Sequence, residues 1–133
     1  MQHDPMRPAI MLGDAEHRQL LILAMIGPGH SADDSDYLHY ELDRASVVAD
    51  ATLPSEVARV RSIVTYRSEG ADGTVTLVYP DEADAAAGMI SVLSSIGATL
   101  LGLRPGQSIT RMGWDGDFRE FAVLSVTPPV TRQ

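Results

Sequence analysis

The chain has 133 residues, no cysteine and a formal net charge of −8, and 44% of its residues are hydrophobic. This composition supports a packed domain with a small appendage, excludes disulfide and thiolate chemistry, and disfavours direct binding to a nucleic-acid duplex through phosphate neutralisation. No apolar run has the length of a membrane span, and the first ten residues lack the pattern of a signal peptide. We therefore expect a cytoplasmic protein without a membrane partner.

The acidic charge is concentrated in the N-terminal part of the chain. Residues 1–52 hold nine acidic residues and three arginines, a net charge of −6, whereas residues 53–133 hold nine and seven, a net charge of −2. Such an acidic pole favours a cationic surface on another protein as its partner. Solubility alone explains the same charge equally well.

The N-terminal part predicts an arm followed by two helices. Residues 1–13 hold two prolines and end in a short extended piece over Ile10–Gly13. Asp14 is placed to cap a helix that runs to Ile26, and the Gly27–Gly29 turn ends it. A second helix follows to about Ser46, opened by a capping-box pattern at Ser31 and Asp34. Two helices joined by so short a loop fold back as an antiparallel hairpin.

A polar linker at Ala49–Pro54 separates this hairpin from a region of strands. Alternating apolar residues predict a strand over Arg59–Arg67, a loop over Glu69–Gly73 and a second strand from Thr74 that Pro80 ends. Met89–Leu93 is then predicted as a short apolar strand.

A short helix follows this apolar strand. Ser94 or Ser95 caps it, and Gly102 supplies a left-handed stop. Its buried side is predicted to consist of Ile96, Leu100, Leu101 and Leu103.

Two more strands complete the chain, at Ser108–Arg111 and Phe118–Val126, joined by a turn over Gly113–Asp117. Because the connections are short, we expect neighbouring strands to pair antiparallel and the sheet to curl over the single short helix. The predicted class is α+β, with an arm and hairpin over 1–52 and a sheet domain over 53–133.

No residue pattern in the chain indicates catalysis, a cofactor or a metal. The histidines are not spaced as metal ligands, and no phosphate-binding glycine loop is present. Ser94 and Ser95 lack the strained elbow of a hydrolase nucleophile. The single tryptophan, Trp114, falls in a predicted surface turn, so we expect no aromatic isomerase pocket.

Two acidic clusters are the candidate partner-binding residues. The first follows the predicted hairpin tip, and the second lies in the loop after Pro80. Capping of a helix explains one or two members of the first cluster, and a solvated loop explains the second. Binding to a basic protein surface is the functional alternative for both. The candidates are Asp33, Asp34 and Asp36 in the first cluster, and Asp81, Glu82 and Asp84 in the second.

Several short sequence motifs resemble those of a known family. LVYPDEAD at Leu77–Asp84, G-x-IS-x-LS at Gly88–Ser94 and IGATLLGL at Ile96–Leu103 are similar to the C-terminal domain of the bacterial Gre transcript-cleavage factors and, more closely, to their shorter Rnk-type relatives. YELDRASVV at Tyr40–Val48 and LPSEV at Leu53–Val57 are weaker matches. The family usually has a basic residue at Met89 and proline at Ser95. The resemblance implies an FKBP-like fold for residues 53–133.

The resemblance also implies a function. It favours a monomeric, non-enzymatic regulator that binds RNA polymerase near its secondary channel and meets nucleic acid only through the polymerase. One alternative is a Gre-type factor that stimulates transcript cleavage, for which the hairpin tip holds acidic residues near a catalytic metal. The other is a protein-interaction module that regulates a nucleoside diphosphate kinase. A first helix of 13 residues reaches only about 20 Å, which argues against cleavage.

Overall fold

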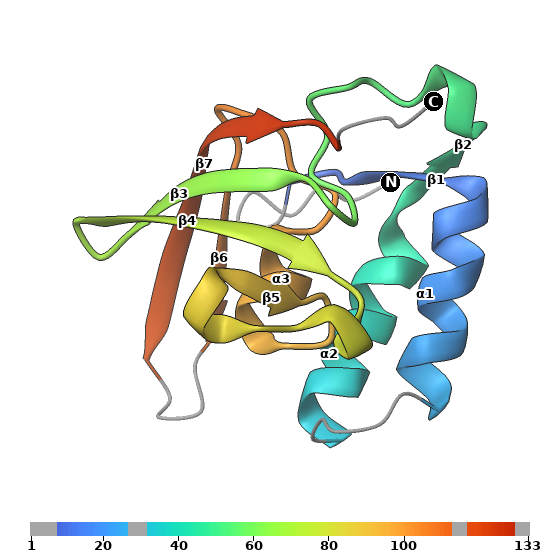
Figure 1. Cartoon of the computed structure of the whole chain (residues 1–133), viewed down its shortest axis with the longest axis horizontal. Helices are drawn as coiled ribbons and strands as arrows, with labels where there is room; N and C mark the ends of the chain where they lie inside the picture. Colours follow the sequence, from blue (N-terminus) through green and yellow to red (C-terminus); the bar gives the residue numbers. More distant parts are fainter. Residues whose placement is uncertain (1–7, 27–31, 113–116, 130–133) are drawn as a thin grey trace.

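A computed structural model describes residues 8–26, 32–112 and 117–129 (Figure 1). Its helices are α1 (Asp14–Ile26), α2 (Ala32–Arg44) and α3 (Ser95–Leu100), with 3₁₀-helical turns η1 (Asp50–Thr52), η2 (Pro80–Glu82) and η3 (Ala85–Ala87). Its strands are β1 (Met11–Gly13), β2 (Ser46–Val48), β3 (Ile63–Ser68), β4 (Ala71–Val78), β5 (Met89–Ser91), β6 (Ser108–Met112) and β7 (Phe118–Thr127). The class is the predicted α+β.

Five strands form one sheet in the order β5-β4-β3-β7-β6. The β3–β4, β3–β7 and β6–β7 pairs are antiparallel, as predicted. The expectation that all neighbours pair antiparallel is wrong for β4 and β5, which are parallel. The ten residues between these strands hold η2 and η3 and bring Met89 back beside Thr76, so β5 runs along the last residues of β4 in the same direction.

The first strand of the sheet starts later than its alternation predicts. β3 begins at Ile63 rather than at Arg59. Arg61 has a left-handed backbone with φ of 74°, and the Ser62 N–H donates to the Arg59 carbonyl at 3.0 Å, so this stretch is a turn. Val60 and Ser62 are nevertheless buried, which explains why the segment resembles a half-buried strand.

The turn between β3 and β4 is also tighter than predicted. It needs only Glu69 and Gly70, both with positive φ, and β4 therefore starts at Ala71. β5 likewise ends at Ser91, before the predicted Leu93.

The two N-terminal helices lie side by side, and α1 has the predicted bounds (Figure 1). α2 ends at Arg44 rather than near Ser46, because Ser46–Val48 forms β2, which pairs in parallel with β1. The Arg44 guanidinium donates to both carboxylate oxygens of the buried Glu41, at 2.9 and 3.0 Å, and to the Pro8 carbonyl at 2.7 Å. This ion pair holds the arm before β1 against the last turn of α2.

The helix α3 is capped at both ends by the residue types that the sequence indicates. Ser94 is the N-cap, and its hydroxyl accepts a hydrogen bond from the Gly97 N–H at 3.1 Å. Gly102 follows the helix with φ of 82°. Of the residues predicted for the buried side, Leu100 is in the helix, whereas Leu101 and Leu103 are buried just beyond it and Ile96 is partly buried.

Among the residues that the structure describes, one hydrophobic core joins both parts of the chain. Ile10, Leu12, Leu20, Leu38 and Leu42 from the N-terminal part pack in one cluster with the sheet and α3. Several predicted features lie outside the described residues: the turn at Gly27–Gly29, the capping residue Ser31, and the predicted turn over Gly113–Asp117 except for its last residue, with Trp114.

Candidate partner-binding site

The first acidic cluster lies where the sequence predicts it, in the first turns of α2. Asp33, Asp34 and Asp36 all belong to this helix, and the Asp36 side chain is exposed. The side chains of the other two aspartates lie outside the described part of the chain. Carboxylates at this end of a helix interact favourably with its macrodipole.

The second acidic cluster divides between two short 3₁₀ turns. Asp81 and Glu82 belong to η2, and Asp84 precedes η3 as its N-cap. Asp81 and Asp84 are exposed, whereas Glu82 accepts two hydrogen bonds from the Arg61 guanidinium, both at 3.0 Å. The pair fastens η2 to the turn before β3, so Glu82 has a structural partner within the chain.

Two adjoining cavities lie between α1 and the end of β4. One, of about 300 Å³, is lined by Gln19, Leu23, Tyr79, Pro80 and Asp81. The other, of about 460 Å³, is lined by Ala15, Glu16, Gln19, Asp50, Arg59 and Tyr79. Because they share Gln19 and Tyr79, we treat them as one groove, which we call the α1–η2 groove.

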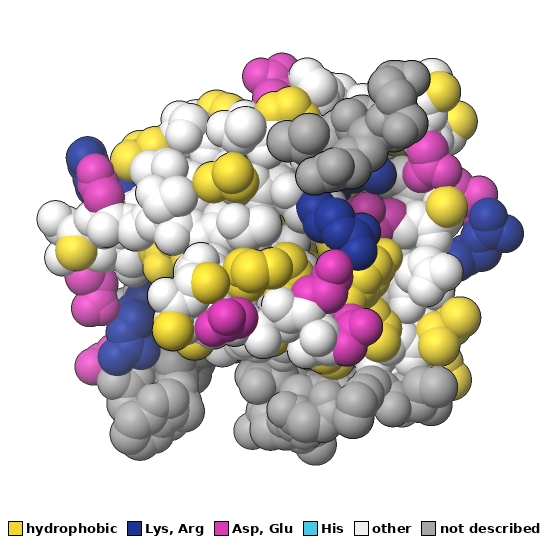
Figure 2. Space-filling view, viewed as in Figure 1, with side chains coloured by type: hydrophobic (Ala, Val, Ile, Leu, Met, Phe, Trp, Pro, Cys, Tyr) yellow, Lys and Arg dark blue, Asp and Glu magenta, His cyan; other side chains and the backbone are white. Residues whose placement is uncertain are grey.

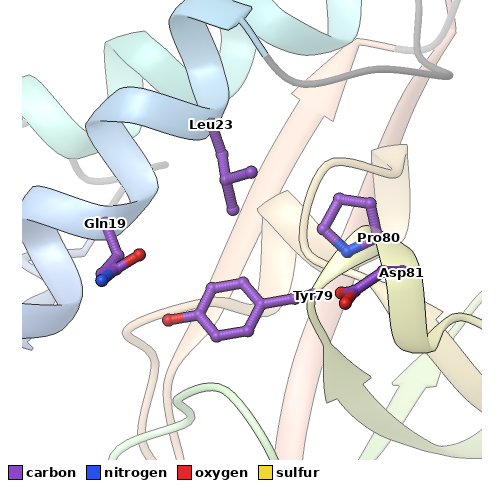
Figure 3. A pocket seen from close by; sticks show the side chains of 5 residues that line it. All are labelled: Gln19, Leu23, Tyr79, Pro80 and Asp81. Atoms are coloured by element: carbon purple, nitrogen blue, oxygen red, sulfur yellow. The ribbon is translucent and has the colours of Figure 1, made fainter.

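Helix α1 forms one wall of the α1–η2 groove, and the segment after β4 forms the other. Figure 3 shows Gln19 and Leu23 extending from α1 toward the Tyr79 ring, with Pro80 and Asp81 following on the same segment. Pro80 ends β4 because it has no N–H to donate, and this places Tyr79 at the strand end facing α1. In Figure 2, acidic, basic and hydrophobic side chains meet on this face, between α1 and the sheet.

A partly buried ion pair forms the floor of the groove. Glu16 accepts a hydrogen bond from the Val60 N–H at 3.0 Å, and its other oxygen lies 3.4 Å from the Arg59 guanidinium. Burial raises the pKa of Glu16, although the Val60 N–H and Arg59 act in the opposite direction. Burial also raises the pKa of Tyr79, with a further contribution from the Glu16 charge.

The structure brings together groove residues that sequence reasoning missed. Among the residues that line the groove, Asp81 is the one predicted site residue. The sequence assigned Glu16 to the first turn of a helix and Asp50 to a linker. It assigned Arg59 and Tyr79 to two strands. The one sequence feature that could have indicated the groove is Tyr79, an aromatic residue at a strand end immediately before Pro80. Nothing local indicates that α1 would cover it.

Within the part of the chain that the structure describes, no group of three or more His, Cys, Asp or Glu side chains is arranged to hold a metal ion. Within the same residues, no helix is long and apolar enough to cross a membrane.

Comparisons with known proteins relate most of the chain to transcription factors. A family model described as "Transcription elongation factor, GreA/GreB, C-term" matches residues 53–128. A regulator of nucleoside diphosphate kinase from Escherichia coli is 35% identical over 105 residues, which cover 77% of each chain. A transcription elongation factor GreA from a Roseiflexus species is 41% identical over 71 residues, covering 52% of this chain and 45% of that protein.

A solved structure shares the fold. It is described as a prokaryotic transcription elongation factor GreA/GreB from Nitrosomonas europaea, is 32% identical and has a TM-score of 0.68. The match covers 91% of this chain and 99% of the other, so the likeness includes the N-terminal helices as well as the sheet.

Proposed function

Since the chain belongs to the family of GreA/GreB transcription elongation factor C-terminal regions, we propose that it is a non-enzymatic transcription regulator that binds RNA polymerase near the secondary channel. The observation that carries this proposal is the likeness to the regulator of nucleoside diphosphate kinase over most of both chains. A likeness that covers 77% of each chain favours a shared mode of action.

In this proposal the two parts of the chain have different tasks. Residues 53–133, taken as an FKBP-like unit of five strands over α3, dock on the polymerase, and the hairpin within residues 1–52 points toward the channel. The acidic residues Asp33, Asp34, Asp36, Asp81 and Asp84 face the basic rim, with Glu82 holding η2 in place through Arg61. Exposed carboxylates mainly steer association and set specificity.

The length of α1 supports regulation without transcript cleavage. The helix has 13 residues, which at the helical rise span about 20 Å. A carboxylate must come within about 2.0–2.1 Å of Mg²⁺ to bind it directly, and a bridging water adds only a few ångströms. With the sheet domain stopped at the rim, a hairpin this short leaves its aspartates far from a deeply placed metal. The protein then acts by occupying the site and excluding longer factors.

Stalled elongation complexes test the proposal. The protein should bind RNA polymerase, compete with a Gre factor for it, and leave the length of the nascent RNA unchanged when added alone. The Gre factor by itself is the positive control for cleavage. Shortening of the RNA by this protein would contradict the geometric argument, and absence of binding at low salt would contradict the proposal itself.

The first acidic cluster provides a separate test. Replacing all three of its aspartates by Asn should leave the chain folded, because Asn has the size of Asp and an exposed carboxylate at this helix end contributes only about 0.3–1 kcal/mol. Binding to polymerase should weaken and become less sensitive to salt, since three charges are removed from the acidic pole. The matched control removes three exposed charges elsewhere, with Asp43→Asn, Glu56→Gln and Glu120→Gln. Equal binding by both triple variants would mean that the cluster contributes to the start of α2 and not to partner binding.

The name of the kinase regulator supports a second candidate function, regulation of a nucleoside diphosphate kinase by direct contact. Titration of the purified protein against that kinase and, separately, against RNA polymerase distinguishes the two partners. Binding to the kinase alone would favour this second function.

A further inference from the structure

The α1–η2 groove combines an apolar wall with carboxylates that no ion pair neutralises in the described part of the chain. Leu23, Pro80 and the Tyr79 ring provide the apolar surface. Glu16 and Arg59 pair with one another, which leaves Asp50 and Asp81 as the remaining charges of the lining. Both aspartates are exposed, so the groove presents two negative charges beside an aromatic and aliphatic surface.

A position beside the start of a helix accounts for only one of these two charges. A side chain built on Gly13 would collide with the Asp50 carboxylate, so this carboxylate lies against the residue that immediately precedes α1. There it interacts favourably with the N-terminal end of the helix dipole. Asp81 lies in η2, a turn of three residues on the other side of the groove. The Asp81 side chain does not lie at the start of α1, although it lines the same cavity as Leu23.

We propose that the α1–η2 groove is a docking site for a segment of the partner protein that carries a lysine or arginine next to an apolar side chain. The cation is attracted by the exposed carboxylates of Asp50 and Asp81, which line the two cavities of the groove. The apolar neighbour packs on Leu23 and Pro80. This inference rests on the proposed function, because it takes the partner to be RNA polymerase.

The groove is preorganised for such a ligand by its surroundings. Arg61 lies over the Tyr79 ring, with its guanidinium carbon 5.8 Å from the ring centre, and is itself held by Glu82. The Glu16 contact to the Val60 N–H fixes α1 relative to the strand region at the other end. The two walls are therefore fixed before a partner arrives, which reduces the ordering cost of binding.

A charge-matched pair of variants tests the electrostatic part. The groove variant is Asp50→Asn with Asp81→Asn, and the control is Glu56→Gln with Glu120→Gln, which removes two exposed charges outside the groove. The Kd for core RNA polymerase, measured by fluorescence anisotropy at fixed salt, should rise about three- to tenfold for the groove variant, as expected for two exposed charge pairs. The control should bind like the original chain, and thermal melts should show that both variants are folded.

Photo-crosslinking tests the location. Gln19 lines both cavities and is exposed, so it tolerates replacement by p-benzoylphenylalanine. After irradiation with RNA polymerase, mass spectrometry should identify a crosslinked peptide that contains Lys or Arg beside an apolar residue. The same photoreactive residue at Glu120, on β7, is the control position and should not label that peptide.

The outcomes separate this inference from the proposed function. If the chain binds polymerase but Gln19 labels nothing and the groove variant binds normally, the groove assignment is overturned and the proposed function stands. Equal weakening by the groove and control variants overturns it as well, because net charge would then explain the effect. If the unaltered chain does not bind polymerase, both are overturned.

Discussion

Gly102→Ala should destabilise the protein far more than the same change at Gly106, although both glycines have a left-handed backbone. Their φ values are 82° and 88°. A Cβ on Gly106 would meet nothing within 4 Å, so this variant has only the conformational cost of alanine in that region, about 1–2 kcal/mol. A Cβ on Gly102 would lie 2.7 Å from the Cβ of Ile10. Because a Cβ cannot rotate away, the backbone of the arm must move.

The displacement adds an overpacking cost of about 1–3 kcal/mol, so the expected total for Gly102→Ala is about 2–5 kcal/mol. The move also strains a hydrogen bond, since the Met11 N–H donates to the Gly102 carbonyl at 3.3 Å. Urea unfolding followed by circular dichroism measures both variants against the original chain. Equal losses of unfolding free energy, within about 0.5 kcal/mol, would refute the packing of the arm against the end of α3.

Two further predictions concern stability. Leu100→Ala should lower the free energy of unfolding by about 2–5 kcal/mol, because Leu100 is fully buried in α3 and its truncation opens a cavity. A decrease below about 1 kcal/mol in urea unfolding would place this residue outside the core. Glu16→Gln should change the pH dependence of stability. Burial raises the pKa of Glu16, so the folded chain keeps this proton to a higher pH than the unfolded chain, and stability falls as the pH rises from the ordinary glutamate pKa through the raised value. The Gln variant should lack that decrease, and its amide oxygen still accepts a hydrogen bond from the Val60 N–H. Urea unfolding at a series of pH values measures this. The same pH dependence of stability in the variant and the original chain would contradict the prediction.

The elements predicted most closely are those whose signals are local. Helix α1 begins at Asp14 and ends at Ile26 as expected, because a capping residue, an apolar stripe and a glycine-proline turn mark its bounds within a few residues of sequence. Gly102 ends α3 for the same kind of reason. In each case the backbone demands a specific residue type, and the sequence shows it.

Features that depend on distant partners were predicted less well. The direction of β5 follows from the path of the ten residues before it, which periodicity does not encode. Burial alternates from Val60 to Val64, yet β3 begins only at Ile63, because Arg61 adopts a left-handed conformation that alternation does not reveal. β2 was not predicted. The second helix was expected to reach its first residue, Ser46, and Ser46–Val48 is too short to show a strand pattern without its partner β1.

The same distinction explains why acidic clusters are poor guides to a binding site. Asp81, Glu82 and Asp84 are close in sequence, but their charges have different surroundings. Glu82 is engaged by Arg61, Asp81 lines the α1–η2 groove, and Asp84 is exposed at the residue before η3. Asp50 joins Asp81 in one groove only because α1 packs across the end of β4. A partner meets the charges that remain after internal pairing, in the arrangement that the fold imposes. A binding surface therefore has to be derived from the ion pairs and cavities of the folded chain, and charge density along the sequence indicates only where to begin.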